Sequence, residues 1–145
     1  IWPLLADGEK DPNKINRLNH TGTHPVHTDL TINDSMDYYE LIGAERKEAR
    51  LRYLQNYWTE KVRHLPRIIV NTPSDPNRSC AIANVGIEGI EPADLAKRLL
   101  KEYQVFTVAI DYANIRGCRI CPNLYTTTKE LDHFIQALKQ LSNNG

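Results

Sequence analysis

The sequence lacks the features that mark several classes of protein. Its three cysteines are an odd and sparse set for a disulfide framework, which favours reduced thiols. Its 18 basic and 18 acidic residues leave no net charge that would attract nucleic acid or an anionic membrane. The longest apolar runs, such as residues 105–110, are far shorter than the roughly 20 residues of a membrane-spanning helix. These absences predict a cytoplasmic protein without nucleic-acid or membrane partners.

The beginning of the chain also lacks an initiator methionine and a signal sequence. It starts instead with the apolar residues 1–5, which would need other residues to pack against. We therefore expect the chain to be a fragment or a processed product. What the 145 residues do have is 41% apolar and 25% charged side chains, the composition of one globular domain.

Hydrophobic periodicity and capping residues predict four helices. Residues 1–25 show no sustained period and are expected to be mostly loop. A Thr-Thr-Lys-Glu capping box precedes the last helix, whose apolar residues recur at three and four positions. The predicted helices cover 28–43, 44–65, a segment that begins at Glu91-Pro92, and a segment that follows the capping box at 127–130.

Extended segments separate the later helices. The β-branched run Ile68–Val70 and residues 79–85 are predicted to form a hairpin, and residues 105–110 and 118–121 are predicted to be two further strands. This order of elements predicts an α+β fold, in which helices cover one face of a small antiparallel-type sheet and a long helix precedes the sheet.

Arg119 is a candidate binding residue because it lies in an otherwise apolar strand. A guanidinium in that position must either extend to water or pair with an anion, and its planar fork suits a carboxylate bidentately. The alternative is a structural salt bridge with a local acid such as Asp111. Sequence spacing alone leaves the two interpretations equally open.

The turn Thr21-Gly22-Thr23 is a candidate phosphate site. Glycine lets the backbone approach a ligand closely, and the neighbouring hydroxyls and backbone N–H groups can hold phosphate oxygens. The alternative is an ordinary turn that leads into the first helix.

Two further patterns suggest chemistry that we do not expect. His20, His24 and His27 have spacing that invites a zinc site, but Pro25 between them prevents a shared helical face, so no metal is predicted. Cys118 and Cys121 have C-x-x-C spacing, yet in a strand they would point to different faces.

Two separated motifs resemble the class V aminotransferase fold of pyridoxal-phosphate enzymes, especially the isopenicillin N epimerase-like members. The first is residues 119–127 (RICPNLYTT), followed by Glu-Leu-Asp at 130–132 and an amphipathic last helix. The second is His-Thr-Gly-Thr at 20–23, followed by Asp-Tyr-Tyr at 37–39, Ile-Gly-Ala-Glu-Arg at 42–46 and a long helix. The resemblance covers nearly the whole chain.

The resemblance implies a C-terminal portion of a fold-type I enzyme. Residues 1–27 would be the remnant of the large domain with the cofactor-phosphate turn, and residues 28–145 the small domain with its linking helix. Arg119 would bind the substrate α-carboxylate, and Gly22 and Thr23 would reach the cofactor phosphate across a homodimer interface. The family's Schiff-base lysine lies upstream of the Gly-Thr turn, so this chain is expected not to be catalytically competent alone.

The resemblance leaves the reaction open. Cysteine desulfurases of this fold carry a catalytic cysteine on a loop ahead of the arginine strand, and residues 111–116 contain no cysteine, which disfavours desulfuration. His24 stands where an arginine is common, and Thr126 where an asparagine is common. The implied function is epimerisation or transamination of an amino acid. The alternative is a non-catalytic interaction domain with Arg119 in a structural salt bridge.

Overall fold

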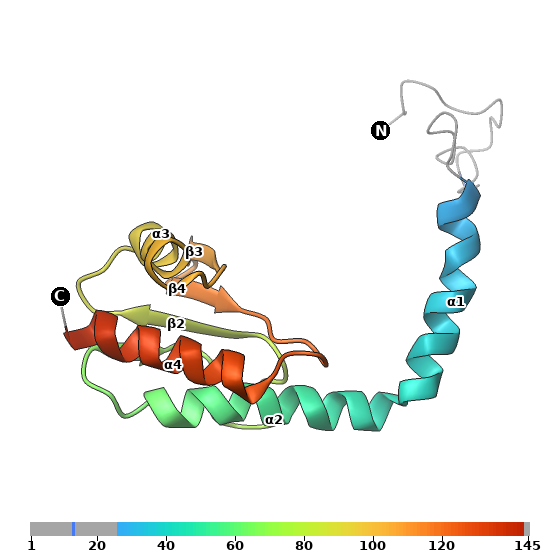
Figure 1. The fold of residues 1–145 in the computed structure, drawn as a ribbon, viewed down its shortest axis with the longest axis horizontal. Coiled ribbons are helices and arrows are strands. Elements are labelled where there is room, and N and C mark those ends of the chain that lie inside the picture. Colours follow the sequence, from blue (N-terminus) through green and yellow to red (C-terminus); the bar gives the residue numbers. More distant parts are fainter. Residues whose placement is uncertain (1–12, 14–25, 144–145) are drawn as a thin grey trace, which may run out of the picture. The chain divides into compact units, whose positions relative to one another are not determined.

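The computed structural model describes residue 13 and residues 26–143, and the chain divides into two units, Ile1–Leu41 and Ile42–Gly145. The described part of the first unit is dominated by the helix α1 (Val26–Ile42), which begins two residues before the predicted start (Figure 1). The separation of a large-domain remnant at residues 1–27 from a small domain at 28–145 stays a prediction.

The second unit is an α+β layer, as the sequence predicts. Its four strands form one sheet in the order β1-β2-β4-β3, with every neighbouring pair antiparallel. Helices α2 and α4 lie side by side in Figure 1, while α3 lies by β3 and β4. In chain order the elements are α2 (Ala44–Val62), β1 (Ile68–Val70), β2 (Ala83–Ile87), α3 (Pro92–Tyr103), β3 (Val108–Tyr112), β4 (Ile115–Ile120) and α4 (Thr128–Asn143).

The helix ends follow local chemistry. Gly43 precedes α2 with φ 84°, a conformation that glycine adopts without strain. The capping box at α4 is formed, because the Thr127 N–H donates to Glu130 Oε2 at 2.7 Å and the Glu130 N–H donates to Thr127 Oγ1 at 3.3 Å. The hydrogen bonds from Thr127 lower the pKa of Glu130. The capping prediction from the sequence is therefore confirmed.

The strand boundaries differ from the predicted ones. β2 begins at Ala83 rather than at residue 79, and β3 spans Val108–Tyr112 rather than 105–110. The apolar run that suggested an earlier β3 contains Phe106, which is 78% exposed in the connection from α3. The run shows no alternation of apolar and polar residues, and strand limits are then set by pairing with β4.

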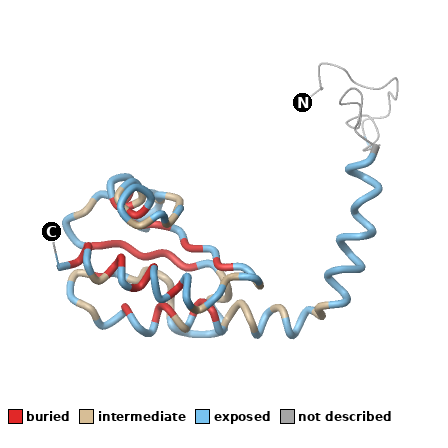
Figure 2. The backbone as a smooth tube through the Cα atoms, in the orientation of Figure 1, coloured by how far each residue is buried: buried red, intermediate tan, exposed pale blue. Residues whose placement is uncertain are grey.

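One apolar core joins three helices to one face of the sheet. Trp58 of α2 meets Phe134 of α4 edge to face, with ring centroids 5.3 Å apart, and both side chains are buried. β2 is buried along its whole length (Figure 2). The cluster contains residues of helices α2, α3 and α4 and of strands β1, β2 and β4: Leu54, Trp58, Val62, Ile68, Ala83, Val85, Ile87, Leu95, Leu99, Cys118, Ile120, Leu131, Phe134, Ile135, Ala137, Leu138 and Leu141.

Arginine side chains tie the loops of this unit to the helical layer. Arg50 of α2 donates to the Thr126 carbonyl at 2.9 Å, which holds the loop between β4 and α4. Arg52 of the same helix donates to backbone carbonyls of the loop between β1 and β2. These cations bind neutral carbonyl oxygens, and the two loops therefore have fixed positions beside the sheet.

Loss of the capping hydroxyl should destabilise the second unit. In Thr127→Ala, the Glu130 N–H loses its acceptor, and we expect the free energy of unfolding to fall by about 1 kcal/mol. Urea denaturation followed by circular dichroism measures this change. Thr128→Ala is the control, because the Thr128 hydroxyl takes no part in the box. Equal effects of the two variants would contradict the assigned cap.

Helix α1 exposes large apolar side chains, among them Leu30, Ile32, Met36, Tyr38 and Leu41. No described helix, α1 included, is long and apolar enough to cross a membrane. Exposed apolar side chains favour association, because association removes them from water.

We therefore expect the chain to self-associate as its concentration rises, measured by static light scattering. Leu41→Glu should lower the average mass, because it places a charge on the apolar surface of α1. Phe106→Glu is a matched control in the second unit, since both side chains are 78% exposed. A monodisperse monomer of the unaltered chain would refute the expectation.

Candidate functional site

Arg119 lies on the face of the sheet opposite the helical layer. Its neighbours Cys118 and Ile120 are buried in the core, so alternation along β4 directs the Arg119 side chain outward, where it is exposed. Asp111 pairs instead with Arg116, with 3.3 Å between Oδ1 and Nε, and Arg116 also pairs with Glu91. Among the described residues no carboxylate forms an ion pair with Arg119, so the salt bridge with Asp111 considered from the sequence is wrong.

Two asparagines form a polar cluster beside Arg119. Asn84 of β2 is the direct cross-strand partner of Arg119. The Asn71 amide donates from Nδ2 to Asn84 Oδ1 at 2.6 Å and to the Arg116 carbonyl at 3.0 Å. The backbone N–H of Asn84 donates to Thr72 Oγ1 at 2.9 Å. The Asn84 Nδ2 atom is buried and has no hydrogen-bond partner among the described residues.

Two glycines make room for this cluster. A Cβ atom on Gly117 would lie 2.6 Å from Asn84 Oδ1 and 2.5 Å from the Val85 carbonyl oxygen. A Cβ atom on Gly86 would lie 2.8 Å from the Arg116 carbonyl oxygen, which accepts from Asn71. Any larger residue would push β2 and β4 apart, so both positions need glycine for close backbone approach.

The connection that precedes the Arg119 strand is a two-residue turn. Tyr112 pairs with Ile115, and the intervening Ala113 and Asn114 have φ values of 48° and 67°. Two residues with positive φ are the requirement of a type I′ hairpin turn. The hairpin therefore has no extended loop between β3 and β4.

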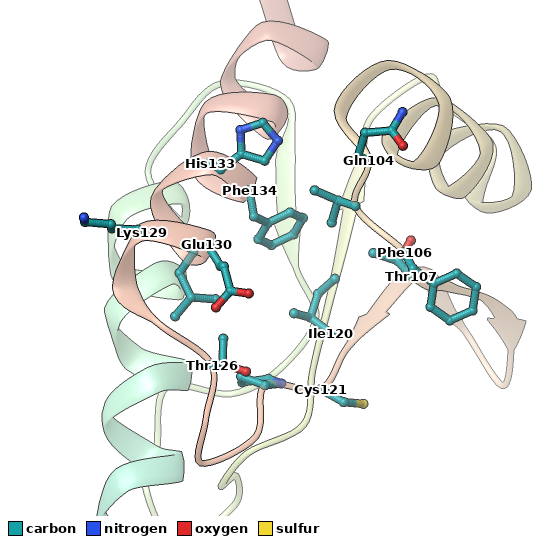
Figure 3. Close-up of a pocket in the computed structure, with 13 residues that line it drawn as sticks. Gln104, Phe106, Thr107, Ile120, Cys121, Thr126, Lys129, Glu130, His133 and Phe134 are labelled. Carbon is teal, nitrogen blue, oxygen red and sulfur yellow. The ribbon is translucent and has the colours of Figure 1, made fainter.

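A groove of about 480 Å³ lies between the end of α3, the end of β4 and the start of α4. Ile120, Leu131 and Phe134 give it an apolar floor, while Lys129 extends away from it (Figure 3). Arg119 does not line the groove. His133 Nε2 lies 2.7 Å from the Tyr103 carbonyl oxygen, so this histidine is held by the fold.

The two cysteines of the C-x-x-C motif occupy different environments, as the sequence predicts. Cys118 is buried in the core, and its Sγ lies 3.6 Å from the Pro92 carbonyl oxygen. Burial raises the pKa of the Cys118 thiol. Cys121 is exposed, and both thiols are free. The pair is not arranged as a redox site.

Several sequence candidates lie outside the described residues. These are Gly22 and Thr23 of the phosphate turn, together with His20 and His24. His27 is exposed on α1. Within the described part of the chain, no group of three histidine, cysteine or acidic side chains could hold a metal ion.

Comparison with known proteins identifies the family. Residues 9–134 match the aminotransferase class-V family. The chain belongs to this family. Its enzymes are pyridoxal-phosphate dependent, as the resemblance of the two motifs implies.

Two curated relatives of this class-V aminotransferase family member are isopenicillin N epimerases. The enzyme of Amycolatopsis lactamdurans is 24% identical, and the match covers 97% of this chain and 38% of the relative. The enzyme of Streptomyces clavuligerus is 25% identical, and the match covers 88% of this chain and 32% of the relative. The chain thus spans about a third of the length of these relatives.

A solved structure shows the fold. The apo cysteine desulfurase of Thermococcus onnurineus superposes with a TM-score of 0.74 at 19% identity, over 86% of this chain and 33% of that chain. The match confirms the α+β architecture predicted from the sequence.

Sequence reasoning found Arg119 and missed the asparagine cluster. A signal was present, because Asn84 interrupts a run of apolar residues in β2 just as Arg119 does in β4. Asn71 offered no such signal, since its role depends on reaching across β2 to the Arg116 carbonyl.

The thiol environments predict a difference in chemical reactivity. Iodoacetamide should modify Cys121 rapidly in the native chain and leave Cys118 unmodified, because the Cys118 thiol is both enclosed and protonated. Peptide mass spectrometry before and after unfolding in urea measures the two rates. Equal native rates, or a disulfide between the two residues, would contradict the assigned burial.

Proposed function

We propose that this chain is the C-terminal portion of a pyridoxal-phosphate enzyme that acts on an amino acid by epimerisation or transamination. The observation that supports the proposal is the exposed guanidinium of Arg119 on β4. Arg119 binds the substrate α-carboxylate, and the amino acid is the small-molecule partner.

The surroundings of Arg119 support a carboxylate ligand. Its guanidinium is exposed on the outer face of the sheet, and Asp111, the acid that most closely precedes it in sequence, pairs with Arg116. The neighbouring Asn84 amide presents a nitrogen without an acceptor. A site that presents hydrogen-bond donors and no acidic side chain of its own fits an anionic ligand. A planar guanidinium prefers a ligand carboxylate, because it can bind the two oxygens with two hydrogen bonds.

Pyridoxal phosphate supplies the electron sink of this chemistry when it is bound. On this proposal Gly22 and Thr23 hold the cofactor phosphate of the partner subunit in a homodimer. The Schiff-base lysine belongs to an upstream segment, since Lys10, Lys14 and Lys47 stand in no matching motif. The 145 residues alone are therefore inactive.

The β3–β4 turn argues against desulfuration. A persulfide-forming cysteine needs a loop that brings it to the cofactor, and this hairpin offers the two residues Ala113 and Asn114. The proposal therefore keeps epimerisation and transamination and omits sulfur transfer, even though a desulfurase shares the fold.

Arg119→Lys in the complete protein tests the proposal. A lysine keeps the charge but loses the bidentate fork, so the KM for the amino-acid substrate should rise about tenfold or more while bound pyridoxal phosphate is retained. Steady-state kinetics measures KM, and the absorption spectrum measures the cofactor.

Arg116→Lys is the matched control, three residues earlier on the same strand. Its partners Glu91 and Asp111 are exposed acids that a lysine can still reach, so KM should stay unchanged. A complete protein that binds no pyridoxal phosphate, or equal KM values in the two variants, would refute the proposed function.

A further inference from the structure

We propose that Asn84 is a second hydrogen-bond donor to the carboxylate that Arg119 binds. The inference rests on the proposed function, since it assumes that Arg119 receives a carboxylate. It adds a residue of another strand to the site.

The orientation of the Asn84 amide follows from its hydrogen bonds. Asn71 Nδ2 donates to Asn84 Oδ1 at 2.6 Å and to the Arg116 carbonyl at 3.0 Å, so both Asn71 N–H groups are used. Turning the Asn84 amide over would set two NH₂ groups against each other. The oxygen of Asn84 must therefore face Asn71, and its nitrogen must face elsewhere.

This nitrogen lacks an acceptor in the described part of the chain. Asn84 is 9% exposed, and Nδ2 has no hydrogen-bond partner among the described residues. Buried side-chain donors are nearly always paired, so each exception calls for a ligand, a water or a functional role. The backbone groups of Asn84 are paired with Asn71 and Thr72, which leaves the amide nitrogen as the exception.

The position of the amide links it to Arg119. Directly opposed residues of antiparallel strands have Cβ atoms about 5 Å apart on one face of the sheet. Asn84 and Arg119 form such a pair. Both groups are donors, so neither can satisfy the other, and the missing acceptor must come from outside the pair.

A carboxylate fits this requirement because its two oxygens accept several hydrogen bonds and carry the charge that Arg119 attracts. Asn84 Nδ2 is enclosed in the free chain. A side-chain movement must therefore open this amide to a carboxylate, and Arg119 is the exposed side chain at the directly opposed position. Asn71, Gly86 and Gly117 hold Asn84 in place for this contact.

Nuclear magnetic resonance of the ¹⁵N-labelled chain tests the inference with sodium acetate as the probe, at constant ionic strength set with sodium chloride. The side-chain signals of Arg119 Nε–H and Asn84 Nδ2 should move together and give one dissociation constant. The Asn71 side-chain signals, whose partners are internal, should move less. Because this measurement needs no variant, it does not depend on how a substitution folds.

Asn84→Asp sharpens the test. The substitution preserves the size of the side chain and the acceptor for Asn71, but places a carboxylate beside Arg119 in competition with the probe. We expect acetate to bind about tenfold or more weakly. Asn56→Asp is the control, because it makes the same change of charge at an exposed position of α2 and should leave the affinity unchanged.

The outcomes separate the two proposals. If the Arg119 signal does not respond to acetate, the carboxylate role of Arg119 fails, and this inference fails with it. If Arg119 responds while the Asn84 signal stays fixed, Arg119 keeps its role and the inference about Asn84 is overturned, whatever the affinity of Asn84→Asp.

Discussion

The alternation of side chains along β2 and β4 is the constraint on which the rest of the second unit depends. Helices α2, α3 and α4 pack into one core on one face of the sheet, so every second residue of the central strands must be apolar. Val85 and Cys118 occupy that face as a cross-strand pair. The next pair, Asn84 and Arg119, is thereby directed to the opposite face. A register shift by one residue would bury a guanidinium in the core, which makes the pairing of β2 with β4 strongly specified.

The outer face of the sheet is also closely packed around the asparagine cluster, although its contacts are polar rather than apolar. The Asn71 amide reaches across β2 to the carbonyl of Arg116, and this path is open because Gly86 and Gly117 have no side chains. Glycine inside a strand weakens the sheet, since it loses more backbone freedom on folding than other residues. β2 and β4 each contain one of these glycines at the point where the amide cluster lies beside Arg119. The glycines lower the local stability of the sheet there, but they allow the side-chain amides of the cluster to have a fixed arrangement.

Most of the fold could be predicted from the sequence because its signals are local. Capping residues and apolar periodicity located the helices, and the Thr127–Glu130 box marked the start of α4. The start of β3 was misplaced, because the apolar residues before Val108 show no alternation and pairing with β4 decides the boundary. Arg119 stood out as a charge among apolar neighbours. The Asn71–Asn84 contact could not be predicted, since it depends on the register of three strands, and no local pattern encodes that register.

The two-residue turn between β3 and β4 has a mechanical consequence. Each strand of the hairpin is paired up to Tyr112 and Ile115, so the backbone at Arg119 has no slack through which it could follow a ligand. The Arg119 side chain can therefore change position only through its own torsion angles, because the backbone of the strand is fixed by its pairing. A carboxylate bound at Arg119, as proposed, would therefore meet a backbone that is already in its final position.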